Sequence, residues 1–114
     1  MRPLLASLAL FWVLAHSSIT HADDTPLAQL SIAKREFSPK ELVLPAGVKV
    51  KLEIRNEDAI PAEFESNDLS REVIVPGHLK VVIYVGPLKP GRYRFFNDFY
   101  PAAEGWVVVG VPSK

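Results

Sequence analysis

The sequence has no cysteine, and beyond residue 22 it has no methionine and a single histidine, His78. The other two histidines, His16 and His21, lie within residues 1–22 together with Met1. Without cysteine the chain can form neither a disulfide nor a thiolate metal site, and it has no cysteine nucleophile. One histidine also leaves little for general acid–base catalysis.

Neither sign of charge is in excess. The chain carries 13 Lys and Arg residues and 13 Asp and Glu residues, which gives a formal net charge of zero. A balanced charge provides no electrostatic argument for nucleic acid or an anionic membrane as a partner. Charges also interrupt every apolar run after the first one, so no later segment is predicted to span a membrane.

The first 22 residues have the pattern of a cleaved signal peptide. Arg2 supplies a positive start, residues 4–15 form an apolar core, and Thr20-His21-Ala22 offers small residues at a cleavage site. The apolar core is shorter than the roughly 20 residues that a membrane-spanning helix needs. We therefore predict cleavage after Ala22, a periplasmic location, and a single domain over residues 23–114.

Short alternating segments dominate the rest of the chain. The clearest is 48–55, in which Val48, Val50, Leu52 and Ile54 alternate with charged residues, as in a strand with one buried face. Proline and glycine punctuate the segments, and no helical pattern is present. Seven or eight strands are expected, at 29–37, 41–44, 48–55, 62–66, 73–75, 79–85, 92–96 and 106–111. This pattern predicts an all-β sandwich or barrel, and periodicity does not separate the two.

Two carboxylates in the segment 62–66 are the first candidates for chemistry. In an extended strand Glu63 and Glu65 share one face, about 7 Å apart along the strand, while Phe64 enters the core. Such a pair repels itself unless it is protonated or bridged by a cation. Carboxylate oxygens suit Fe²⁺ and Mn²⁺ and tolerate Cu²⁺. The alternative is a solvated strand edge.

Further candidates lie later in the chain. Asp98 stands in a loop expected between the last two strands, although Asn-Asp is also a common turn former. Glu72 is a possible fourth ligand, unless it pairs with Arg71. Glu104 and His78 are weaker candidates.

The sequence contains no Ser-His-Asp set and no phosphate-binding loop. It therefore favours an accessory metal-binding protein over an enzyme, although paired carboxylates could still perform acid–base work.

Three segments taken together resemble a known family. They are FSPKELVLPAG at 37–47, EFESNDLSREVIVPG at 63–77 and GPLKPGRYRFFNDF at 86–99. In this order they are similar to the cupredoxin-like domain proteins of bacterial periplasms, particularly those associated with ferrous-iron permease systems. The resemblance implies a Greek-key β-sandwich, iron or copper handling, and a membrane iron permease or another iron-uptake protein as partner. It also implies that the Asp98 loop lies at the same end of the sandwich as Glu63.

This chain departs from the copper-binding members of that fold. A blue-copper (type 1) centre needs two histidines and a cysteine thiolate, and the segment 97–104, where the fold places several of these ligands, contains none. Tyr100 stands where some relatives carry a histidine.

Two hypotheses follow. The first is a metal-binding module that presents iron, or helps to oxidise it, with or without copper. The second is a metal-free sandwich that docks to partner proteins. The sequence leaves open whether a site forms within one chain or across a homodimer.

Overall fold

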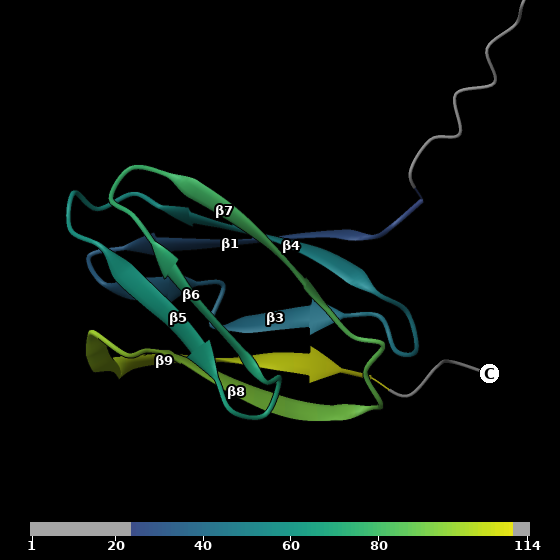
Figure 1. The fold of residues 1–114 in the computed structure, drawn as a ribbon. Coiled ribbons are helices and arrows are strands. Elements are labelled where there is room, and N and C mark those ends of the chain that lie inside the picture. Colours follow the sequence, from purple (N-terminus) through teal and green to yellow (C-terminus); the bar gives the residue numbers. More distant parts are fainter. Residues whose placement is uncertain (1–23, 111–114) are drawn as a thin grey trace, which may run out of the picture.

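A computed structural model describes residues 24–110 as two packed β-sheets (Figure 1). The strands are β1 (Leu27–Ala33), β2 (Glu36–Ser38), β3 (Glu41–Leu44), β4 (Val50–Asn56), β5 (Ala62–Ser66), β6 (Arg71–Val75), β7 (Lys80–Val85), β8 (Gly91–Asn97) and β9 (Tyr100–Val109). One sheet has the order β2-β1-β4-β7 and the other β3-β9-β8-β5-β6. The expected all-β sandwich is therefore confirmed. The predicted signal peptide lies outside the described residues.

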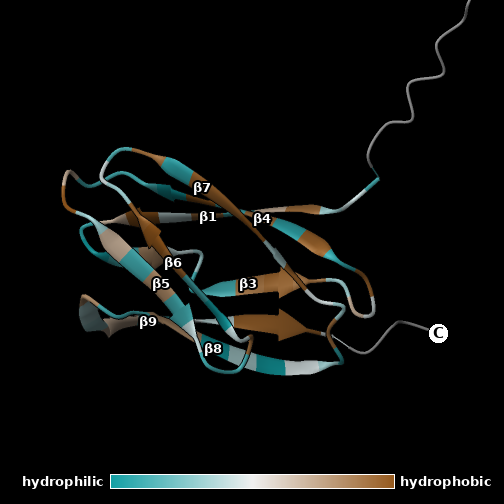
Figure 2. Ribbon diagram, in the orientation of Figure 1, coloured by the Kyte–Doolittle hydropathy of each residue, from teal (hydrophilic) through white to brown (hydrophobic). Residues whose placement is uncertain are grey.

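The alternation seen in the sequence sets which faces are buried. In β4, Val50, Leu52 and Ile54 are almost fully buried, and the residues between them face outward. Figure 2 shows apolar and polar segments alternating along this strand. Within residues 24–110, no helix is long and apolar enough to cross a membrane.

Three phenylalanine rings join the sheets at the centre of the core. The centroid of Phe37 lies 4.9 Å from that of Phe95 and 6.3 Å from that of Phe64, and Phe64 and Phe95 are 5.3 Å apart. The first two contacts are edge-to-face, a favoured arrangement of aromatic pairs. Phe64 belongs to β5, so its contacts with the other two rings hold the strand that carries Glu63 and Glu65 against the core.

The expected strand at 29–37 is two strands. The chain turns at Lys34 and Arg35, which have φ values of 52° and 67°, and β2 then pairs back on β1. The two carboxylate oxygens of Asp58 accept the backbone N–H groups of Lys34 and Arg35, each at 2.8 Å. The described residues therefore hold nine strands, against the seven or eight expected. This turn is hard to predict from the sequence, because residues with positive φ are usually Gly, Asn or Asp and here they are Lys34 and Arg35.

The expected loop at 97–104 is a tight turn. Asn97 pairs with Tyr100, so only Asp98 and Phe99 connect β8 to β9. The final strand, expected to begin at residue 106, begins at Tyr100. It includes Gly105, where an added Cβ would lie 2.4 Å from the ring of Phe95. The glycine that resembles a loop signal thus allows close packing within the strand.

Candidate metal site

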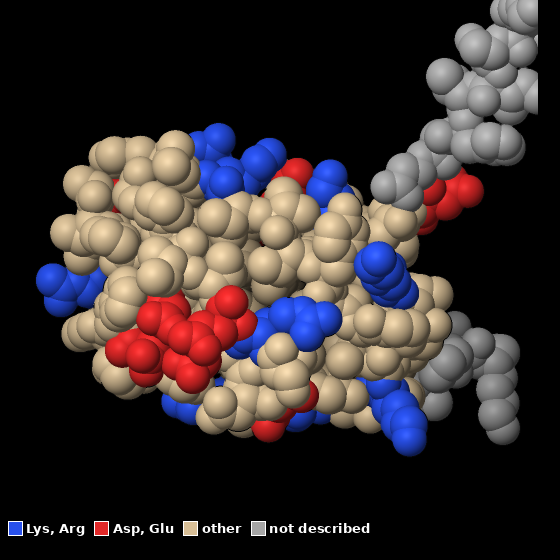
Figure 3. Space-filling view, in the orientation of Figure 1, with Lys and Arg blue, Asp and Glu red and all other residues tan. Residues whose placement is uncertain are grey.

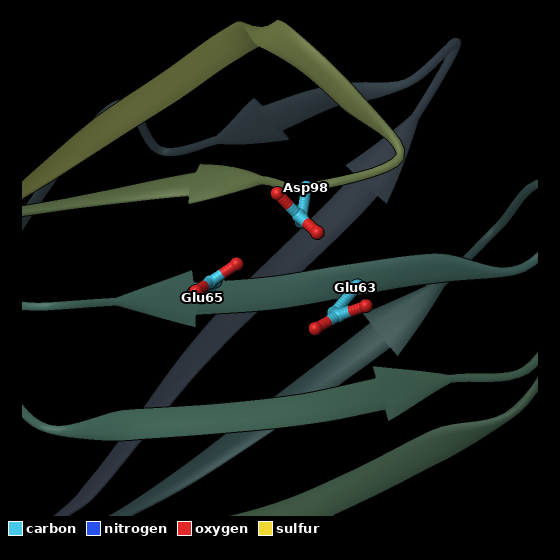
Figure 4. A group of neighbouring side chains, drawn as sticks. All are labelled: Glu63, Glu65 and Asp98. Atoms are coloured by element: carbon cyan, nitrogen blue, oxygen red, sulfur yellow. The ribbon is translucent and has the colours of Figure 1, made fainter.

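The alternation of β5 places its carboxylates as predicted. Phe64 is fully buried in the core, together with Ala62 and Ser66, which share its face of the sheet. Glu63 and Glu65 point away from that core on the outer face of the five-stranded sheet (Figure 4). Only 7% of Glu63 is exposed, because neighbouring strands crowd it, whereas Glu65 is half-buried.

The turn between β8 and β9 brings the third carboxylate. The N–H of Asp98 donates to the carbonyl oxygen of Glu63 at 3.0 Å, so the turn lies against β5. One carboxylate oxygen from each of Glu63, Glu65 and Asp98 lies within 4.8 Å of the other two. Among residues 24–110, no other group of three or more His, Asp or Glu side chains converges in this way.

Glu72 stands at the edge of this cluster. It belongs to β6 and pairs directly with Glu65 across the two strands, and its side chain is hydrogen-bonded to that of Glu63. The guanidinium of Arg71 instead donates to the carbonyl oxygens of Tyr84 and Ser70, both at 2.9 Å. The structure thus brings all four predicted carboxylates together, with Glu72 beside the converging three. Figure 3 shows acidic side chains gathered in one patch over this part of the molecule.

Crowding raises the pKa of two of these carboxyls. The hydrogen bond to Glu72, then burial, then the charges of Glu72, Asp98 and Glu65 raise the pKa of Glu63 from 4.5 to about 7. Burial, followed by the charges of Asp98 and Glu72, raises the pKa of Glu65. The negative charges around Glu63 and Glu65 make these two carboxyls harder to ionise. Since no ion pair within residues 24–110 neutralises these four carboxylates, a bound cation would relieve their repulsion.

Residues 4–109 match the family model of the cupredoxin-like domain. The chain belongs to this family. A relative in Rickettsia prowazekii (strain Madrid E), an uncharacterised protein, is 40% identical over 82 residues. That alignment spans 71% of this chain and 66% of the relative's length.

Solved structures show the same fold. A purple cupredoxin from Nitrosopumilus maritimus is 21% identical to this chain and has a TM-score of 0.54. The two structures superpose over 73% of this chain and 99% of the purple cupredoxin. The metal-binding domain of the Cu(I)-exporting P-type ATPase CopA from Streptococcus pneumoniae D39, determined with Cu(I), has a TM-score of 0.66 and 14% identity. The superposition covers 81% of this chain and 92% of the CopA metal-binding domain. At these identities the likeness shows the fold alone.

The donor set of this cupredoxin-like domain is all oxygen. The chain has no cysteine, so it cannot hold a type 1 copper centre. His78 lies outside the cluster, exposed in the turn after β6. The guanidinium carbon of Arg35 lies over the ring of Tyr100, 5.1 Å from the ring centroid. Glu104 forms an ion pair with Arg94, with Nε and Oε2 2.7 Å apart. The residues present fit a hard or borderline divalent cation held by carboxylates.

The role of Asn97 was not evident from the sequence. Its Oδ1 accepts the N–H of Phe99 at 3.1 Å. This bond forms an Asx turn, the alternative role of the Asn-Asp pair, and Asn97 makes it instead of Asp98. Because Asn97 makes the turn, the side chain of Asp98 is free to face Glu63 and Glu65. The Asn-Asp pair was the available signal, but it did not show which residue makes the turn.

Proposed function

We propose that this cupredoxin-like domain is an exported periplasmic module that binds iron, with or without copper, and presents it to a membrane iron-transport system. The observation that carries the proposal is the convergence of oxygens from Glu63, Glu65 and Asp98 within 4.8 Å. The signal-peptide pattern and the resemblance of the sequence to proteins of ferrous-iron permease systems support the location and the partner.

The surroundings of the cluster suit the delivery of a metal better than its storage. Asp98 and Glu72 are exposed, and a surface hollow borders Glu65 and Glu72, so a cation could enter and leave without opening the core. Oxygen ligands without thiolate predict modest affinity. Protons compete for the same oxygens, so affinity should fall as the pH is lowered. A partner could complete the coordination from the solvent side during transfer.

The same ligands would also assist oxidation of the iron cargo. Anionic oxygens stabilise Fe³⁺ more than Fe²⁺, because the Coulomb attraction grows with the charge of the ion. The electron would have to pass to a separate acceptor, such as a copper ion or a redox partner. The domain is therefore proposed as an accessory protein whose site favours the oxidised product.

A metal-free docking module is the second candidate. The hydrogen bond between Glu63 and Glu72 favours it, because a shared proton partly relieves the repulsion without any cation. In that case the acidic patch would contact a basic surface of a periplasmic partner.

Calorimetric titration of residues 23–114 with Fe²⁺ under anaerobic conditions, Mn²⁺ and Cu²⁺ separates the two candidates. We expect one Fe²⁺ or Mn²⁺ per chain, with binding abolished by Asp98→Asn and unchanged by Glu57→Gln, an exposed carboxylate outside the cluster. One cation per two chains would place the site across a homodimer. If the wild type binds none of the three ions, the docking function replaces the metal-binding one.

A transport assay tests the partner. In cells that lack this protein, the wild type should restore uptake of radioactive iron at low iron supply, and Asp98→Asn should not. Equal restoration by both proteins would contradict a role for the site in uptake.

A further inference from the structure

The backbone of Glu63 is held by two consecutive residues of the β8–β9 turn. Its N–H donates to the side-chain Oδ1 of Asn97 at 3.1 Å, and its carbonyl oxygen accepts the N–H of Asp98 at 3.0 Å. The same Oδ1 accepts the N–H of Phe99 at 3.1 Å. One buried oxygen therefore joins the strand that carries two of the carboxylates to the turn that carries the third.

The regular ladder between β5 and β8 cannot do this alone. It pairs only Glu65 with Phe96 and Phe64 with Asn97. On the other side of β8, the ladder to β9 has a register irregularity between Phe96 and Asn97. Beyond this point the turn depends on the amide of Asn97 and on the single backbone bond from Asp98. Asn97 is 2% exposed, so water does not readily replace its hydrogen bonds.

We infer that Asn97 is the positioning residue of the site: its side-chain amide holds the Asp98 carboxylate beside those of Glu63 and Glu65. This inference rests on the proposed function. Outer groups that orient metal ligands typically change metal affinity by about 10- to 100-fold when they are removed. With alanine at position 97, the N–H groups of Glu63 and Phe99 lose their acceptor. Only the backbone bond from Asp98 to Glu63 then holds the turn against β5, so the position of the Asp98 carboxylate is less well defined.

The chain provides a matched control. Asn56 is also fully buried, and it too connects a loop to a strand: its Nδ2 donates to the carbonyl oxygens of Ile60 at 2.8 Å and Val75 at 3.1 Å, and its Oδ1 accepts the N–H of Asp58 at 2.9 Å. None of these bonds involves a carboxylate of the site. Asn56→Ala therefore measures the effect of losing a buried asparagine network without disturbing Asp98.

The experiment is a calorimetric titration with Mn²⁺, below the melting temperature of every variant. We expect Asn97→Ala to weaken binding about tenfold or more, and Asn56→Ala to change it less than about twofold although both lower the melting temperature. Asn97→Ser should recover part of the affinity, because a hydroxyl can accept the same N–H bonds more weakly.

The outcomes separate this inference from the proposed function. Wild-type affinity in folded Asn97→Ala, or an equal loss in Asn56→Ala, would overturn the positioning role while the metal site stands. If Asn97→Ala does not fold, Asn97→Ser decides: a loss greater than that of Asn56→Ala supports the role, and wild-type affinity overturns it. Absence of Mn²⁺ binding by the wild type would reject the proposed function and this inference together.

Discussion

At the scale of the residue, Glu63 combines burial with three acidic neighbours. The residue is 7% exposed, and its carboxyl is hydrogen-bonded to Glu72 and lies near Glu65 and Asp98. Burial and like charge both disfavour the ionised form, so the two effects add and do not cancel. A bound cation would therefore favour the ionised form of Glu63.

The stability of the metal-free domain should fall as the pH rises. The pKa of Glu63 is about 7 in the folded chain, against an ordinary 4.5, so the folded state binds more protons between these two values. Its contribution to stability is complete below about pH 4.5 and is lost as the pH rises through 7. Thermal denaturation with a chelator present should give a lower melting temperature at pH 8 than at pH 5. Glu63→Gln should flatten this dependence, and an unchanged dependence in that variant would contradict the assignment.

Glu65→Gln should separate stability from binding. The pKa of Glu65 is raised by burial and by the charges of Asp98 and Glu72, so removing its charge lessens repulsion in the metal-free protein. We expect an unchanged or higher melting temperature together with weaker Mn²⁺ binding. Glu57→Gln should change neither. A clear loss of stability in Glu65→Gln would show that the carboxylate is held by favourable contacts.

At the level of single strands, the buried face could be predicted from the sequence where apolar and polar residues alternate regularly. The alternation in β4 predicted its buried face, and the same rule placed Glu63 and Glu65 together around Phe64. It failed at turns whose geometry depends on distant side chains. The turn at Lys34 and Arg35 relies on Asp58, which no local pattern reveals.

The dependence of that turn on Asp58 can be measured. Asp58→Ala removes the acceptor of two backbone N–H groups, each bonded at 2.8 Å, at residues with positive φ. Hydrogen bonds to a charged group contribute about 1.5–3 kcal/mol each when buried, and less near solvent, so a loss of about 2 kcal/mol is expected. Urea denaturation measures this loss. Glu57→Ala, a change at the adjacent exposed residue, should cost less than about 0.5 kcal/mol. Equal effects would show that the turn does not need Asp58.

At the scale of the whole molecule, the site is assembled from three separate pieces of chain. β5, β6 and the β8–β9 turn each contribute carboxylates, and the core phenylalanines behind β5 keep the supporting sheet in place. Strand alternation predicted that Glu63 and Glu65 share a face, and the resemblance to a family predicted that the Asp98 loop lies at the same end of the sandwich. Neither could predict how closely these residues meet, because that distance depends on the register irregularity before Asn97 and on the two-residue turn.

Export is a prediction for the molecule as a whole. If residues 1–22 are a signal peptide, N-terminal sequencing of the protein recovered from the periplasm should begin at Asp23. Replacing Leu8 and Leu10 with arginine should keep the precursor in the cytoplasm, because the apolar core would be interrupted. A mature protein that retains residues 4–15 would contradict this prediction.

Anomalous diffraction from crystals of the mature domain grown with Mn²⁺ would show directly whether the three carboxylates bind a cation. We expect one strong anomalous peak per chain, coordinated by oxygens of Glu63, Glu65 and Asp98, with Glu72 as a fourth ligand or hydrogen-bonded beside it. The same peak should be absent from crystals of Asp98→Asn grown with the same Mn²⁺ concentration. Well-ordered wild-type crystals with no peak at these carboxylates, or with the ion bound elsewhere on the domain, would contradict the proposed site.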